Sequence, residues 1–166
     1  MERLENSRWG FESNCFVCEE NNHAGLGLEF FVDRDDEAVV ADFSLDQRFS
    51  GAPSYVHGGI VLAVLDEAMA WATIALSGSF AVTKETTTRF RAPVQVGGSY
   101  RVRAVVEQDD GHQLQCRAEV TDHDSTLCAA AAATFVPLGP AQAVDAIGTT
   151  VTGDDVGYVR ETGRSE

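Results

Sequence analysis

The feature that most constrains the fold of this 166-residue chain is the stretch Ser54–Leu76, SYVHGGIVLAVLDEAMAWATIAL. It has the length of a long helix, and apart from the adjacent acids Asp66 and Glu67 it is apolar on nearly every side. A helix that is apolar all round has to be covered by other parts of the protein. The two acids interrupt the apolar run, so we expect no membrane span and no membrane partner.

The segments on both sides of this helix are predicted to be strands. β-branched residues, alternation of apolar and polar positions, and turn signals indicate strands at Leu26–Val32, Ala38–Leu45, Ala81–Arg91, Tyr100–Glu107, Gln113–Val120 and Leu127–Val136. This order predicts an α+β fold in which one antiparallel sheet wraps around one long central helix. Because a sheet covers only one side of a helix, we expect a second copy of the chain to cover the rest, in at least a dimer.

The chain is expected to form a single domain over residues 1–138. Its first 25 residues form an N-terminal segment that contains a C-x-x-C motif. Residues 139–166 are rich in Gly, Thr and Asp without a sustained apolar period, which favours a loose or disordered tail.

Charge and the N-terminus exclude some classes of function. The net charge of −14 argues against nucleic acid as a partner, because binding to phosphates requires a basic face. The first residues lack the basic and apolar regions of a signal peptide, so a cytoplasmic protein is expected.

The four cysteines are expected to be free thiols in that compartment. Cys15-x-x-Cys18, followed by His23, resembles half of a zinc site, but no second C-x-x-C or H-x-x-x-H pair supplies the other ligands. The simpler interpretation is a compact turn that packs small polarisable side chains. We therefore predict no metal, while a metal or redox protein built on Cys15 and Cys18 is an alternative class.

The start of the helix is suited to binding a developing negative charge. Its first-turn N–H groups have no partner within the helix, and Gly58 and Gly59 leave the backbone open to close approach. Asp66 follows His57 by nine residues, about 13 Å along the axis, so it cannot act at the start of its own helix. A two-fold dimer would resolve this distance. Alternatively, the two acids face solvent or a partner arginine on a purely structural helix.

The segment HGGIVLAVLDEAMAWA resembles the signature of the hotdog-fold acyl-CoA thioesterases, in particular their PaaI-like branch. The upstream segment CFVCEENNHAGLGLEF is similar to an N-terminal segment of the same family, with Glu19 and His23 in place of its Gly and Pro. The segment AVTKETTTRFRAPVQVGGSYRVRAVV is similar to the family's next two strands. The resemblance extends roughly from Cys15 to Leu138.

This resemblance implies a hotdog fold, dimeric or tetrameric, that hydrolyses an acyl-CoA thioester to free acid and CoA at a dimer interface. It implies no cofactor, because coenzyme A is part of the substrate. A non-catalytic acyl-CoA-binding hotdog protein is the alternative.

The resemblance also assigns roles to residues. Asp66 stands at the catalytic carboxylate, as general base or nucleophile. The N–H of Gly58, in the segment with His57 and Gly59, polarises the thioester carbonyl. Thr83 helps to position the water. Gly51 stands where some relatives carry Asn or Gln.

An acidic protein that binds anionic CoA requires a local positive site. Arg89 and Arg91 share one face of a predicted strand, and Arg101 and Arg103 share one face of the next strand. If these two strands form a hairpin, the four arginines make one patch for the CoA phosphates. The alternative is an exposed sheet face with ordinary ion pairs to acids.

Overall fold

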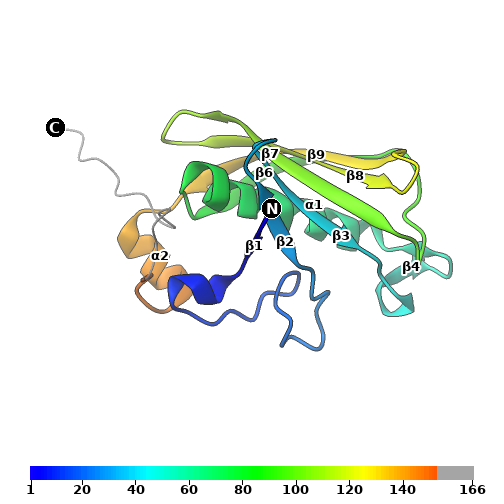
Figure 1. Ribbon diagram of the computed structural model, residues 1–166, viewed down its shortest axis with the longest axis horizontal. Helices are drawn as coiled ribbons and strands as arrows, with labels where there is room; N and C mark the ends of the chain where they lie inside the picture. The colour runs from blue at the N-terminus through cyan, green and yellow to red at the C-terminus, as the bar shows by residue number, and fades with distance from the viewer. Residues whose placement is uncertain (153–166) are drawn as a thin grey trace.

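The computed structural model describes residues 1–152 as one sheet with a long helix packed against it (Figure 1). The elements, in chain order, are β1 (Glu2–Leu4), η1 (Asn6–Trp9), β2 (Phe30–Asp33), β3 (Ala38–Phe43), η2 (Gln47–Phe49), β4 (Ser50–Ala52), β5 (Tyr55–Val56), α1 (Gly58–Ser77), β6 (Ala81–Phe90), β7 (Tyr100–Asp109), β8 (Leu114–Asp122), β9 (Leu127–Pro137) and α2 (Pro140–Ile147).

The main sheet has seven strands in the order β1-β2-β3-β7-β8-β9-β6, and all neighbouring pairs are antiparallel. Consecutive strands β7, β8 and β9 form a meander, whereas β6 pairs with β9 and so lies at one edge. β4 and β5 form a separate two-stranded pair just before α1. The predicted antiparallel sheet around one long helix is therefore confirmed.

α1 is the central element of the fold. His57 caps its start, and Gly78 ends it in the left-handed conformation with φ 60°. The residues of α1 that are buried are Val61, Val64, Leu65, Ala68, Met69, Trp71, Ala72, Thr73, Ile74 and Ala75. By length and hydropathy alone α1 could cross a bilayer, so its two acids do not by themselves exclude a membrane span. Here α1 packs against β3 and β6–β9 as a core helix.

The side of α1 away from the sheet is covered by this chain's own N-terminal segment and α2 (Figure 1). Trp9 of η1 is only 2% exposed and stacks on Trp71 of α1, with ring centroids 5.8 Å apart. A second copy is therefore not needed to cover this part of the helix, and the expected dimer stays a prediction. The sheet faces one side of α1, and residues from before and after the sheet close much of the other.

The tail is more ordered than expected at residues 140–147, which form α2. Pro140 stands in the first turn, the Gly139 N–H donates to the Gln142 side chain, and Gly148 closes the helix with φ 84°. Proline, whose φ suits a first turn, and a C-terminal glycine are strong boundary signals. The rest of the expected tail, residues 153–166, lies outside the described residues.

Candidate active site

The start of α1 presents one free backbone donor. The ring of His57 accepts a hydrogen bond from the Gly59 N–H at 2.9 Å through Nδ1, so His57 is the helix cap and Gly59 is engaged. Within residues 1–152 the Gly58 N–H has no hydrogen-bond partner. It lies at the positive end of the helix dipole, where a carbonyl oxygen that gains negative charge would be stabilised. Of the three residues predicted here, Gly58 fits the role of donor best.

A pocket of about 320 Å³ opens beside this donor. A methyl group added at Gly58 would lie 3.5 Å from the Phe90 ring, so this ring is the part of the pocket wall nearest to Gly58. Phe90 is 54% exposed, an unusual position for a large apolar side chain. Arg91 adds a positive charge to the lining. The lining residues are Tyr55, Val56, Gly58, Val61, Phe90, Arg91, Ala92, Pro93 and Val94.

Gly51 lies directly against His57. A Cβ added at Gly51 would be 3.0 Å from the His57 Cα and 3.1 Å from its Cδ2. The backbone of β4 therefore approaches the helix cap more closely than a side chain would readily allow. In this chain the position supports the cap and does not supply a polar group to the pocket.

Asp66 and Thr83, two of the predicted site residues, are in contact. The Thr83 hydroxyl on β6 donates to Asp66 Oδ1 at 2.8 Å. This contact orients the carboxylate, and among residues 1–152 its other oxygen, Oδ2, has no hydrogen-bond partner. Asp66 stands eight residues after Gly58 on one continuous helix, about 12 Å along the axis. One chain therefore does not bring its own base and its own carbonyl donor together.

The four predicted arginines do not form one patch. β6 and β7 are separated in the sheet by β9 and β8, so the expected hairpin does not exist. Arg101 makes two 2.7 Å hydrogen bonds to Asp42, its partner across β3 and β7, and Arg103 donates to the Asp36 carbonyl. Arg89 is exposed on β6, which leaves Arg91 as the one member that lines the pocket beside Gly58.

The second acid of α1 meets the cysteine motif of the N-terminal segment. A hydrogen bond of 3.4 Å joins Cys15 Sγ and Glu67 Oε1. A hydrogen bond from Cys18 lowers the pKa of Cys15 from 9.0 to about 5, whereas desolvation raises the pKa of Glu67 from 4.5 to about 8. The hydrogen bond with Cys15 raises the pKa of Cys18. The sequence interpretation treated Glu67 and the motif separately, because they lie far apart in the chain.

Part of the chain is similar in sequence to known proteins. Residues 54–129, from the loop before α1 into β9, match the model of a family described as the thioesterase superfamily. The acyl-coenzyme A thioesterase THEM4 from Xenopus laevis is 25% identical over 119 residues, and the mouse protein of that name is 27% identical over 120 residues. These matches cover 70% of this chain but only 53% and 51% of the relatives, so the chain spans about half of their length.

Solved structures show the same fold. The phenylacetic acid degradation-related protein of Ralstonia eutropha JMP134 matches with a TM-score of 0.59 and 27% identity over 67% of this chain and 85% of that one. The Escherichia coli PaaI protein matches with a TM-score of 0.62 and 20% identity, over 69% of this chain and 81% of that one. Streptococcus mutans smu.793, bound to acetyl CoA, matches with a TM-score of 0.59 and 17% identity, over 62% of this chain and 82% of that one. The fold is that of the hotdog proteins, and residues 54–129 are similar to the thioesterase superfamily.

Proposed function

We propose that this chain hydrolyses an acyl-CoA thioester to the free acid and CoA, at a site shared by two copies. The observation that carries the proposal is the Asp66 carboxylate, held by Thr83 on the same fold that presents the free Gly58 N–H. The thioesterase-superfamily match over residues 54–129 supports the same chemistry.

In the proposed reaction the thioester carbonyl oxygen accepts a hydrogen bond from the Gly58 N–H at the start of α1. Asp66 of the other copy supplies the carboxylate, which either removes a proton from the attacking water or attacks the carbonyl carbon itself. The carbon–sulfur bond then breaks, CoA leaves as the thiol, and water supplies the new oxygen of the acid. The helix dipole and the donor stabilise the oxyanion that forms between these steps.

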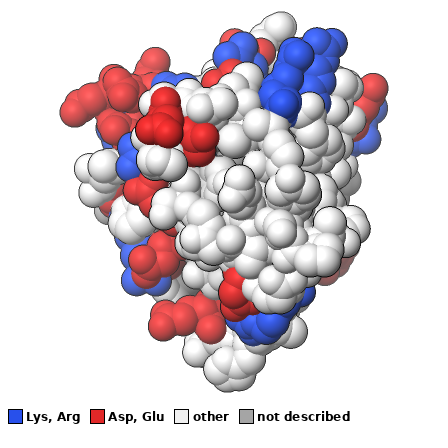
Figure 2. Space-filling model, turned by 90° about the vertical axis from the view of Figure 1, so that its right-hand side faces the viewer, with Lys and Arg blue, Asp and Glu red and all other residues white. Residues whose placement is uncertain are grey.

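Self-association is part of the proposal because the two groups lie about 12 Å apart along one helix. The edge strand β6 supports it. This ten-residue strand pairs with β9 on one side, and most of its residues are exposed, including Val82 at 45%. A long exposed edge is a ready template for pairing with another chain. Figure 2 shows a further candidate surface, an uncharged area bordered by charged side chains at the end of the molecule that carries β4.

The test is the substitution Asp66→Asn, which keeps the shape of the side chain but removes the base. Hydrolysis of acyl-CoA should fall by roughly 10²–10⁴-fold in kcat, with KM changed little. Free thiol release should be measured over short, long and aromatic acyl-CoAs, because the acyl group is not assigned. Asp35→Asn, in the exposed turn between β2 and β3, is the matched control.

Full turnover by Asp66→Asn would show that another group acts as base. Binding of acyl-CoA by the unaltered protein without release of thiol would instead indicate a non-catalytic acyl-CoA-binding protein. Cytoplasmic localisation stays a prediction, which fractionation of the source cells would test.

A further inference from the structure

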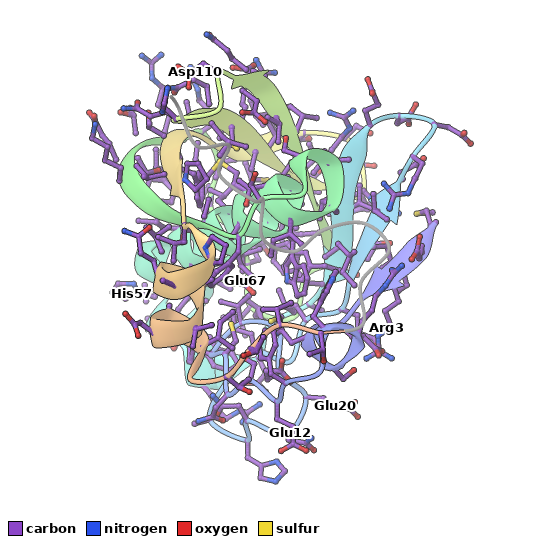
Figure 3. The ribbon with its side chains drawn as sticks, turned by 90° about the vertical axis from the view of Figure 1, so that its left-hand side faces the viewer. Arg3, Glu12, Glu20, His57, Glu67 and Asp110 are labelled. Carbon is purple, nitrogen blue, oxygen red and sulfur yellow. The ribbon has the colours of Figure 1, made fainter. Side chains whose placement is uncertain are left out.

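Three metal-ligating side chains converge where the N-terminal segment meets the middle of α1. The sulfurs of Cys15 and Cys18 and a carboxylate oxygen of Glu67 all lie within 4.8 Å of one another. Figure 3 shows Glu67 in the interior, between the central helix and the N-terminal segment, with sulfur atoms nearby. The donors therefore come from two elements that are distant in sequence, and the tertiary fold brings them to one point.

Hydrogen bonds to both sulfurs fix this arrangement. The Val17 N–H donates to Cys15 Sγ at 3.3 Å, within the turn of the motif. The Asn6 amide donates to Cys18 Sγ at 3.9 Å and to Glu19 Oε1 at 2.7 Å, and Asn6 is only 8% exposed. N–H donors around sulfur ligands orient them and stabilise their anionic form, as the outer shell of a metal site does.

The cluster has no cation of its own. Among residues 1–152, no lysine, arginine or histidine forms an ion pair with Glu67. Glu67 also stands beside Asp66 on the same helix, which adds negative charge to this part of α1. As metal ligands, the two thiolates and the carboxylate would bring negative charges into contact, and a divalent cation would balance most of that charge.

We propose that Cys15, Cys18 and Glu67 bind one zinc ion per chain. Paired thiolates favour zinc over the hard cations, and zinc accepts sulfur and carboxylate ligands in a tetrahedral site. The fourth position falls to a water molecule or a small anion from the adjoining cavity of about 340 Å³, which both Cys15 and Glu67 line. Phe11, Trp71 and Phe80 form apolar walls of that cavity, and its polar lining includes Asn6, Glu12, Ser13 and Asn14.

This site is separate from the proposed thioester chemistry, which uses Asp66 and Gly58. The ion would link the N-terminal segment to α1 at the residue next to Asp66, and so would stabilise the cover over the helix. The prediction of no metal rested on the lack of a second cysteine or histidine pair. The third ligand of the proposed site is Glu67, which comes from α1 and not from a second motif of this kind.

The experiment loads the reduced, metal-free full chain with Zn²⁺ and removes unbound metal over a weak chelator. One zinc per chain should remain by elemental analysis, and bound zinc should raise Tm. Substitution with Co²⁺ should give sulfur-to-cobalt charge-transfer absorption and the visible bands of a tetrahedral ion. Cys15→Ser, Cys18→Ser and Glu67→Gln should each weaken zinc binding at least about 10-fold.

Two controls isolate the site. Asp66→Asn removes the neighbouring acid of the same helix, and Cys128→Ala removes a buried cysteine of β9; both should keep the zinc. Circular dichroism of each metal-free variant identifies any that fails to fold, and the Co²⁺ spectrum of the unaltered protein does not depend on the variants. Zinc that is not retained, equal binding by Glu67→Gln, or a Cys15–Cys18 disulfide that persists under reducing conditions with zinc present would each overturn the proposal.

Discussion

Gly58 combines a free backbone N–H with the absence of a side chain at the wall of a pocket. A methyl group there would stand 3.5 Å from Phe90, which is ordinary van der Waals contact. Alanine also suits a helix better than glycine does. Space and conformation therefore permit the substitution. Alanine keeps the N–H, and its methyl group would narrow the approach to that donor.

For this reason Gly58→Ala should leave Tm unchanged or slightly raised while it lowers kcat. The loss should reach at most roughly 10²-fold, the scale of losing one donor to an oxyanion altogether. Thermal unfolding measures the expected effect on Tm, and acyl-CoA hydrolysis by the same preparation measures the expected effect on kcat. Unimpaired turnover would remove Gly58 from the proposed reaction.

Arg91 is the predicted arginine that lines the pocket beside Gly58, and so it is the candidate contact for the CoA phosphates. Arg91→Gln should raise KM for acyl-CoA by about 10-fold with little change in kcat, since a hydrogen bond between charged groups contributes about 1.5–3 kcal/mol. Steady-state kinetics test this, with Arg101→Gln as the control because Arg101 is already paired with Asp42. Equal KM values for both variants and the unaltered protein would contradict the assignment.

At the scale of elements, the pair of β3 and β7 is joined on its outer face by Asp42 and Arg101, which stand opposite each other in the register. The Arg101 hydrogen bonds lower the pKa of Asp42 from its ordinary 3.8. Because that pKa is lower in the folded protein than in the unfolded chain, the pair stabilises the fold above pH 3.8. The contribution is lost as the pH falls through the lowered value.

Asp42→Asn should therefore cost only about 0.2–1 kcal/mol at pH 7, because both side chains are largely exposed. Urea unfolding should show the difference shrinking toward zero at acid pH and at high salt. Asp35→Asn, whose carboxylate forms no ion pair among the described residues, gives the baseline. A difference that persists unchanged well below pH 3.8 would show that the effect comes from packing and not from the charge.

At the scale of the whole molecule, the proposed reaction requires two copies of the chain. The exposed edge of β6 is our candidate for the dimer interface. Val82→Lys places a charge on that edge and should weaken the dimer by at least about 10-fold, with loss of activity at low protein concentration. Sedimentation over a dilution series measures the dissociation. Val144→Lys, at an exposed valine on α2, is the matched control. Unchanged association by Val82→Lys would place the interface elsewhere.

Several parts of the structure follow from local patterns in the sequence. The apolar run and the glycine at its end predicted α1, and alternating residues predicted β7 and β8 closely. Ala129–Ala133 is helical by propensity, yet it forms part of β9 because it continues a run of hairpins. Hydrophobic periodicity and turn residues are local signals. They therefore identify helices and strands well, but they say little about which strands pair with each other.

The family resemblance named Asp66 and Thr83 as separate site residues, and the hydrogen bond between them became visible only in the structure. The arginine patch was wrong for a topological reason. Arg89 and Arg101 lie on consecutive strands, but β6 pairs with β9 at the edge and β7 pairs with β3 and β8. Which strands become neighbours depends on long-range pairing, which periodicity does not encode.

The sequence by itself determined the elements of this protein, its one long apolar helix, and the presence of a donor and an acid too far apart on that helix to act together. These follow from residue spacing, because 1.5 Å of rise per residue and the preferences of each side chain are local properties. Only the tertiary structure decided that the N-terminal segment covers α1 and that Glu67 meets Cys15 and Cys18. Such contacts depend on how distant segments pack around a shared core, and that packing is a property of the whole chain.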